Sequence, residues 1–293
     1  MYARAAIGLV PGFARPDRLP DTMSQRQGVR IDRAHLADYN RVCGFRLTDR
    51  LPATYPHVLA FPLAFRLMSG RDFPFPVIGL VHVANRIELR RPIDAGEPLD
   101  LAVHAADLRE HARGRQLDVV STAMVDGEVV WRDVSTYLRR EGTGSSGGAR
   151  GDRAEPPPAS ARWRLTPRVG TDYARVSGDH NPIHTSRLGA RLFGFARPIA
   201  HGMWSKARCL AALEGRLPEA YTVDVSFKLP VLLPSTVAFS ATGAAGTAEV
   251  AEAIEATEVR GAAGVAAAAA PEWTFALHSA KSGKPHLDGT ITA

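Results

Sequence analysis

The chain repeats one order of elements on the two sides of a segment rich in glycine, serine and proline, and this repeat most constrains its fold. The segment at 141–160 reads EGTGSSGGARGDRAEPPPAS and offers almost no apolar side chain to a core. The chain has 293 residues, more than the ~100–150 residues of a usual single domain, so two domains or one duplicated domain is expected. We expect an N-terminal unit, a linker and a C-terminal unit, at 1–140, 141–160 and 161–293.

Each half contains one apolar helix candidate, at 55–68 in the first half and at 202–213 in the second. A strand candidate, a proline-marked kink and further strand candidates follow both helices. Valine and threonine content and short polar turns favour strand over helix in these segments. The strand candidates lie at 77–89, 99–108, 116–124, 128–138, 221–229, 236–244, 248–260 and 273–279. The pattern predicts an α+β fold in which each half has a long central helix wrapped by a mostly antiparallel sheet. An alanine-rich tract at 262–270 is interrupted by glycine and is expected to form a loop or a weak edge.

The composition argues against several other classes of protein. Hydrophobic residues make up 45% of the chain and charged residues 23%, as in ordinary globular proteins. No run approaches the ~20 apolar residues that a membrane span requires. The apolar patch at 1–10 is too short for a secretory signal. Cys43 and Cys209 lie far apart without metal-ligand spacing, which predicts neither a disulfide framework nor a zinc site. We therefore expect a cytoplasmic protein without a membrane span.

The net charge of +6 is spread over both halves of the chain. There is no polybasic tail and no aromatic signature of RNA binding, so we expect no nucleic-acid partner. A mild positive field favours an anionic ligand, such as a nucleotide phosphate or an acidic carrier protein. A diffuse, solvated surface would explain the same charge equally well.

The run SGDHNPIH at 177–184 places an acid, Asp179, five residues before an imidazole, His184. Asn181 can cap a helical turn and Pro182 suits its first position, so Asp179 and Asn181 could simply be turn and cap residues. A role as turn and cap residues does not explain why His184 follows at a fixed spacing. An acid–base pair is what addition of water to an enoyl thioester requires, because a base must take the proton of the water that attacks C3 and an acid must protonate C2.

A glycine at the start of the second helix candidate adds a third element. Gly202 follows His201 in the run PIAHGM, and its amide can lie against a carbonyl oxygen because it has no Cβ. The helix start adds positive dipole character, which would stabilise a thioester enolate. A tight loop-to-helix junction would also explain the glycine, and His201 could either orient this turn or only pack. Upstream, 171–177 is interpreted as a short helix opened by a Thr/Asp cap.

No other catalytic signature competes with these residues. The chain has no Gly-x-Ser-x-Gly elbow, no Walker A loop, no dinucleotide-binding glycine pattern and no HExxH zinc motif. We therefore expect chemistry that needs neither a metal nor a cofactor.

Taken together, SGDHNPIH, GFARPIAHGM and SFKLPVLLP closely resemble the MaoC-like, (R)-specific enoyl-CoA hydratase family of the hot-dog fold, over 163–240. The resemblance implies that Asp179 and His184 are the catalytic pair. It also implies that Gly202 supplies the amide of an oxyanion hole and that Phe227 lines the thioester site.

The first half resembles the noncatalytic N-terminal repeat of double hot-dog members, because it lacks an Asp-x-Asn-Pro-x-His run. The resemblance implies that this repeat makes room for a bulky acyl tail and helps to bind CoA. It implies a ligand contact by His82, although Val83 replaces a glycine that is common at the next position. It also implies a basic ligand contact in the loop 109–115. A solvated hairpin tip would explain that loop as well. The substrate-binding candidates are Asn181, His201, Phe227, His82, His111 and Arg113.

The leading hypothesis is a hydro-lyase that reversibly hydrates trans-2-enoyl thioesters to (R)-3-hydroxyacyl thioesters, with coenzyme A favoured over acyl carrier protein as the carrier. The alternatives are a 3-hydroxyacyl-acyl-carrier-protein dehydratase, a noncatalytic acyl-thioester-binding subunit and a hot-dog thioesterase. Two repeats can already form the pseudo-dimer, so we expect a monomer or a homodimer.

Overall fold

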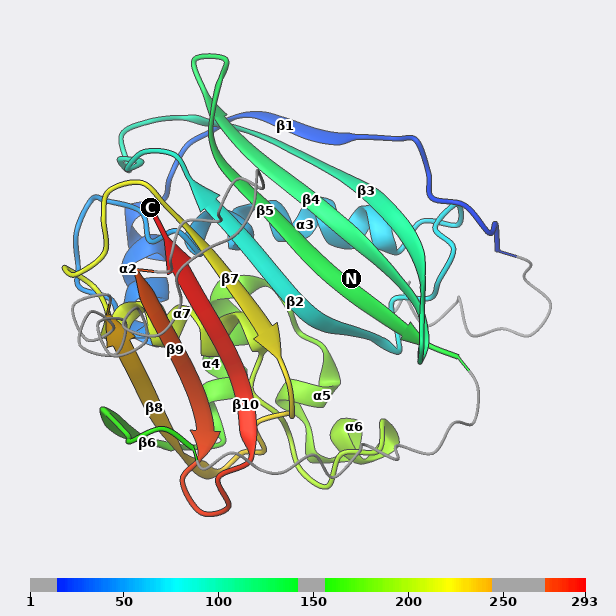
Figure 1. The fold of residues 1–293 in the computed structure, drawn as a ribbon. Coiled ribbons are helices and arrows are strands. Elements are labelled where there is room, and N and C mark those ends of the chain that lie inside the picture. Colours follow the sequence, from blue (N-terminus) through cyan, green and yellow to red (C-terminus); the bar gives the residue numbers. More distant parts are fainter. Residues whose placement is uncertain (1–14, 142–155, 244–271) are drawn as a thin grey trace, which may run out of the picture.

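The computed structural model describes residues 15–141, 156–243 and 272–293, which form an antiparallel sheet with helices on one face (Figure 1). The predicted strand at 248–260, the alanine-rich tract at 262–270, the patch at 1–10 and most of the linker lie outside these residues. The strands run in the order β1-β3-β4-β5-β2-β7-β10-β9-β8-β6. This arrangement agrees with the predicted α+β class.

The strands are β1 (Ser24–Val29), β2 (Leu80–Leu89), β3 (Leu99–His111), β4 (Gly114–Val125), β5 (Glu128–Arg140), β6 (Ala161–Leu165), β7 (Tyr221–Phe227), β8 (Ser235–Gly243), β9 (Trp273–Ser279) and β10 (Pro285–Thr292). The helices are α2 (Arg33–Cys43), α3 (Tyr55–Met68), α4 (Arg168–Ser177), α5 (Pro182–Thr185), α6 (Arg187–Leu192) and α7 (Gly202–Ala212).

The central helix of the first half, α3, spans the predicted residues and continues through Pro62. A second proline, Pro56, lies in its first turn, where a missing amide donor costs nothing. The start of the helix is held to the sheet because the indole of Trp131 on β5 donates a hydrogen bond of 2.7 Å to the carbonyl of Ala53. Since α3 is apolar over most of its length, burying it against the sheet accounts for its stability.

The central helix of the second half, α7, is likewise buried along most of its length. The indole of Trp204 donates to the carbonyl of Val42 at the end of α2, at 3.1 Å, and ties α7 to the first half. Cys43 and Cys209 are both buried and free. Among the described residues, no helix is both long and apolar enough to cross a bilayer.

The two halves of the sheet join where β2 pairs antiparallel with β7. Ala84 lies opposite Ser226 and Leu89 opposite Tyr221, so ten strands form one surface. The pairing brings the end of β7 beside the middle of β2. Side chains from both halves can therefore line one common space.

The structure also corrects parts of the sequence-based prediction. The elements α2, α6, β1, β6 and β10 were not expected, so the first half has more than one helix. The helix expected at 171–177 begins at Arg168 after the N-cap residue Pro167, and the predicted Thr/Asp cap is wrong. Thr171 lies inside the helix, where its hydroxyl donates to the Arg168 carbonyl at 3.0 Å.

The packing of α4 against the segment that carries His184 depends on Gly170. A Cβ at Gly170 would overlap the carbonyl oxygen of His184. We expect Gly170→Ala to lower the free energy of unfolding by ~1–3 kcal/mol, because the backbone would have to move away. Urea unfolding measures this loss. The matched control is Thr171→Ala, an exposed position on the next residue, and an equal loss in both variants would contradict the explanation.

Candidate active site

A cavity of about 840 Å³ is lined by side chains from both halves of the chain. The first half contributes residues of α3, β2, β4 and β5, and the second half residues of α4, α5, α7 and β7. Most of the predicted site residues lie on its wall, namely Asp179, Asn181, His184, His201, Gly202, Phe227, His82 and Arg113.

The loop between α4 and α5 presents the candidate acid–base pair to the cavity. Gly178 ends α4 in the left-handed conformation, with φ of 75°, which glycine adopts without strain. The Asp179 carboxylate then accepts a hydrogen bond of 3.1 Å from the Asn181 amide. Asn181 caps α5 by accepting from Ile183 N–H, as expected, and Pro182 follows at the first helical position. This short turn brings His184 back toward Asp179.

The tautomer of His184 follows from its backbone contact. Its Nδ1 lies 2.8 Å from the Ile199 carbonyl, which can only accept, so Nδ1 carries the proton in the neutral ring. Nε2 is then left with a lone pair, as a general base requires. Burial lowers the pKa of His184, and the neighbouring Asp179 only partly opposes this effect. The ring is therefore neutral at pH 7.

His201 supports both members of the pair. Its ring stacks on that of His184, with centroids 3.6 Å apart. Its Nε2 lies 3.0 Å from the Asp179 carbonyl and 3.8 Å from the carboxylate. Burial, reinforced by His184, lowers the pKa of His201 to about 3, so the contact with the carboxylate is not an ion pair at neutral pH. These contacts favour an orienting role over packing alone.

The side chains of Asp179, His184 and His201 each bring one nitrogen or oxygen atom to within 4.8 Å of the others. That spacing suits a water molecule held between acid and base. It would also suit a metal ion, since each ring has one nitrogen on a backbone carbonyl, as metal-binding histidines usually do. The expectation that the chemistry needs no metal therefore stays a prediction.

Gly202 is the first residue of α7 and lies on the cavity wall. No carbonyl within the helix can accept from its amide, and the helix N-terminus adds positive potential there. A Cβ at this position would lie 3.1 Å from the Phe227 ring, tighter than ordinary packing allows. The glycine thus forms a close junction and also lies on the cavity wall, so the two explanations are compatible and the oxyanion role stays a prediction.

The two substrate-binding candidates in the hairpin between β3 and β4 differ in their position relative to the cavity. Arg113 lies on the cavity wall, whereas His111 does not and instead accepts a 3.1 Å hydrogen bond from the Arg113 amide through Nδ1. Arg115 pairs with Glu141 at 2.8 Å, which leaves it a structural role. The cavity has further basic lining residues, Arg109, Arg140 and Lys228.

Several lining residues were missed by sequence reasoning, among them His57, Phe61, Tyr137 and Tyr173. His57 could have been noticed, because it is a polar residue within the otherwise mainly apolar helix at 55–68. The other residues carry no comparable signal in the sequence.

A family model described as MaoC-like domain matches residues 152–263. The 3-hydroxyacyl-thioester dehydratase X of Mycobacterium tuberculosis is 37% identical over 291 residues, which cover 98% of this chain and 95% of that protein. The chain belongs to the MaoC-like dehydratase family. The crystal structure of HtdX from M. tuberculosis aligns with a TM-score of 0.75 at 34% identity, over 92% of this chain and 99% of that chain. A MaoC-like dehydratase from Phytophthora capsici, with a TM-score of 0.64 at 17% identity over 94% and 95% of the two chains, shares the fold.

These neighbours confirm the double hot-dog class expected from the sequence. Enoyl-CoA hydratase ChsH3 of M. tuberculosis is 27% identical over 54% of this chain and 58% of that protein. Membership in a family of hydratases and dehydratases supports a hydro-lyase that acts on acyl thioesters.

The buried neutral histidines make stability depend on pH. Burial holds the pKa of His201 at about 3 in the folded state, below the ordinary value of 6.5, so its contribution is present above about pH 6.5 and is lost as the pH falls toward 3. His201 therefore adds ~1.3 kcal/mol per pH unit to the slope of the unfolding free energy between about pH 5.5 and 4.5. We expect His201→Asn to remove about that much slope.

Urea unfolding at a series of pH values measures this slope. The control is His180→Asn, because His180 is exposed in the same loop. A slope that is unchanged in the His201 variant would show that this ring is not held neutral.

Proposed function

We propose that the protein reversibly hydrates trans-2-enoyl thioesters to (R)-3-hydroxyacyl thioesters. The observation that carries this proposal is the approach of the Asp179 carboxylate and a His184 ring nitrogen, within 4.8 Å, on the wall of a cavity that Gly202 also lines. The names of its relatives, a 3-hydroxyacyl-thioester dehydratase and an enoyl-CoA hydratase, support the same reaction. The (R) configuration rests on the resemblance of the SGDHNPIH run to the (R)-specific enzymes.

In the proposed mechanism the thioester carbonyl accepts a hydrogen bond from the Gly202 amide, which stabilises the enolate that forms as water attacks C3. Asp179 and His184 hold that water between them. The water oxygen bonds to C3, its proton passes to the pair, and the pair delivers a proton to C2. Because both groups act from one side, the addition is syn. Dehydration uses the same groups with their roles exchanged.

We assign supporting roles to three further residues. His201 would hold Asp179 and His184 in position relative to each other, since it contacts both. Asn181 would fix the turn between them through its cap. Phe227 would form the wall against which the thioester lies, beside Gly202.

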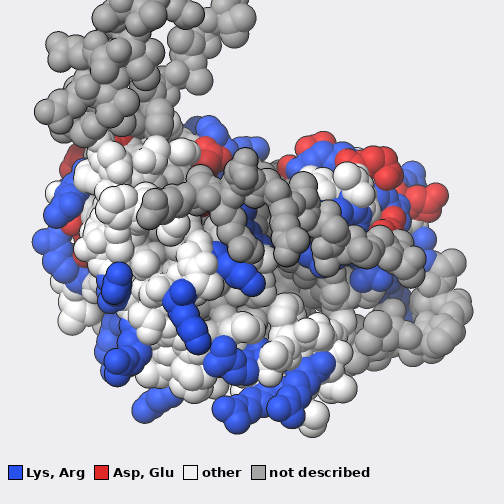
Figure 2. All heavy atoms as spheres, turned by 60° about the horizontal axis from the view of Figure 1, so that its bottom comes forward, with Lys and Arg blue, Asp and Glu red and all other residues white. Residues whose placement is uncertain are grey.

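We favour coenzyme A over acyl carrier protein as the thioester carrier. Four basic residues line the cavity, namely Arg109, Arg113, Arg140 and Lys228. Because Arg109 and Lys228 are paired with aspartates, we assign the contact with the CoA phosphates to Arg113 and Arg140. Figure 2 shows that basic side chains are also scattered over the end of the molecule formed by β6 and α6, with acidic ones confined to its rim. A carrier protein could use that face, so the test below includes it.

In this proposal the unit 161–293 carries the acid–base chemistry, and the unit 1–140 forms part of the substrate wall through His82 and Arg113. We place the enzyme in the cytoplasm, as a monomer or a homodimer, in keeping with its two free cysteines and its two repeats.

Removing either proposed catalytic group should stop turnover without unfolding the chain. We expect Asp179→Asn and His184→Ala each to lower kcat by at least ~10²-fold, the usual contribution of a positioned proton transfer. Loss of enoyl absorbance in the ultraviolet follows hydration, and circular dichroism checks the fold. His180→Ala is the matched control, because His180 lies between the two residues but does not line the cavity. A near-normal rate in either test variant would refute its assigned role.

A panel of trans-2-enoyl thioesters of graded length, on CoA and on acyl carrier protein, tests the reaction itself. We expect hydration of CoA esters, an (R) product on chiral analysis, no release of free thiol and no loss of rate with a chelator. Absence of turnover with every chain length and carrier would favour a binding subunit, and thiol release would favour a thioesterase.

A further inference from the structure

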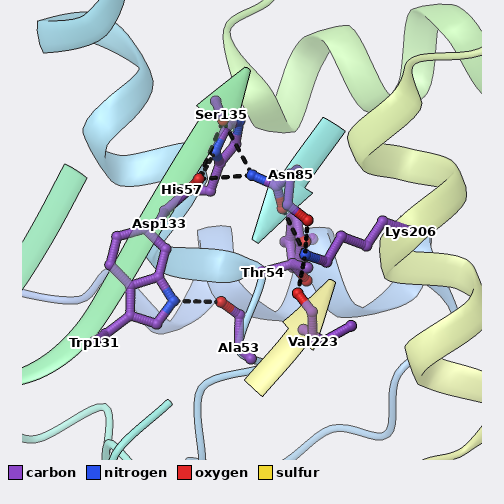
Figure 3. Close-up of polar contacts among 10 residues, drawn as sticks. Ala53, Thr54, His57, Asn85, Trp131, Asp133, Ser135, Lys206 and Val223 are labelled. Atoms are coloured by element: carbon purple, nitrogen blue, oxygen red, sulfur yellow. Dashed lines mark hydrogen bonds and ion pairs between the residues drawn. The ribbon is translucent and has the colours of Figure 1, made fainter. Parts of the chain in front are cut away.

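A second buried polar cluster lies on the first-half wall of the cavity, and the reaction described above does not use it (Figure 3). His57 on α3 places its Nδ1 2.5 Å from a carboxylate oxygen of Asp133 on β5. The other carboxylate oxygen accepts from Asn85 at 2.6 Å and from Ser135 at 3.1 Å. His57 also lines the cavity, so this dyad faces the space that the substrate would occupy.

The cluster keeps Asp133 ionised and oriented. Burial alone would raise the pKa of this carboxyl, but His57 and Lys206 outweigh that effect and hold the pKa below its ordinary value. Lys206 on α7 donates to the side-chain oxygen of Asn85 at 2.5 Å. This contact sets the amide so that its nitrogen points to Asp133. The carboxylate therefore faces His57 as a fixed hydrogen-bond acceptor.

A fixed acceptor at Nδ1 determines what His57 can offer to a ligand. In the neutral ring the proton resides on Nδ1, so Nε2 presents a lone pair. Nearby, His82 has a buried Nε2 without a hydrogen-bond partner among the described residues. Burial lowers the pKa of His82 to about 3, so its ring is neutral too. The His82 ring lies parallel to that of His57, with centroids 6.5 Å apart.

The cluster lies close to the proposed reacting centre. Phe61, one helical turn after His57 on the same face of α3, lies 3.9 Å from the position a Cβ would take on Gly178. The His82 ring lies 5.0 Å from that of Phe227, which packs on Gly202. An acyl chain whose thioester rests at Gly202 would thus pass near both histidines.

We propose that His57, with the His82 ring beside it, provides a hydrogen-bond-accepting subsite that selects acyl thioesters with a hydroxyl group beyond C3. This inference rests on the proposed function. A plain alkyl chain would cover Nε2 of His57 and leave its lone pair without a partner, which is unfavourable. An oxo group on the acyl chain has no hydrogen-bond donor for this lone pair. A hydroxyl satisfies the lone pair of His57, and sites built for a substrate hydroxyl discriminate strongly against analogues that lack it.

Equilibrium binding of saturated CoA thioesters tests the subsite independently of turnover. Isothermal titration at pH 7.5 would compare each unsubstituted acyl-CoA with isomers of the same length that carry one hydroxyl or one oxo group at successive positions from C5. We expect one hydroxyl isomer to bind at least ~10-fold tighter than its parent, and the oxo isomer at that position to gain nothing. His57→Phe should reduce the hydroxyl-to-parent ratio to about one.

A second variant separates recognition from a structural role. In Asp133→Asn the oxygen would stay with Asn85 and Ser135, so the amide nitrogen would face His57 and donate to Nδ1. The proton of the ring would move to Nε2, and the oxo isomer should then bind tighter than the unsubstituted parent. If the His57–Asp133 pair had only a structural role, Asp133→Asn would not change the binding preference from the hydroxyl isomer to the oxo isomer. His104→Phe, on β3 and outside the cavity wall, is the matched control and should retain the native ratios.

The outcomes distinguish this inference from the proposed function. Hydration of plain enoyl-CoAs without any hydroxyl preference in binding would overturn the subsite and leave the reaction intact. A preference that survives His57→Phe would also overturn it. A hydroxyl preference without turnover would support the subsite and remove the proposed reaction. Failure of every acyl-CoA to bind would overturn the subsite, and the reaction as well if thioesters on acyl carrier protein are not hydrated either.

Discussion

One buried lysine holds the two halves of this protein together. Lys206 on α7 is fully buried and donates to the carbonyls of Asn85 on β2 and Val223 on β7, each at 3.1 Å, as well as to the Asn85 side chain. These two strands form the junction of the sheet. Burial lowers the pKa of Lys206 to about 7, against the opposing effect of Asp133 and Asp224. A buried amine with too few acceptors would be strongly destabilising, so the junction must keep all of them in place.

The cavity depends on that junction because its two walls come from different halves. On one wall, His184 and His201 are stacked, neutral and tied to backbone carbonyls. On the other, His57 is tied to a carboxylate. Histidine side chains thus occupy two different electrostatic environments on the cavity walls. A carbonyl partner and deep burial keep a ring uncharged beside Asp179, whereas an ionised partner fixes the proton of His57 on one nitrogen.

The placement of the second-half site residues could be predicted because these residues lie close together in the sequence. Asp179, Asn181 and His184 lie within one turn, so capping rules alone place them together, and Gly202 is recognisable from the start of its helix. The pairing of His57 with Asp133 spans 76 positions and depends on the strand register, which composition does not specify. His111 shows the converse limit, since it lies in the same hairpin as Arg113 but bonds to the Arg113 amide and does not line the cavity. The helix α2 is a different case, because local signals do mark it: Asp32 caps its start and the left-handed Gly44 ends it.

The mixed origin of the cavity has an evolutionary consequence. Substitutions on α3, β2 or β5 can remodel the space around a bound chain while the loop between α4 and α5 stays as it is.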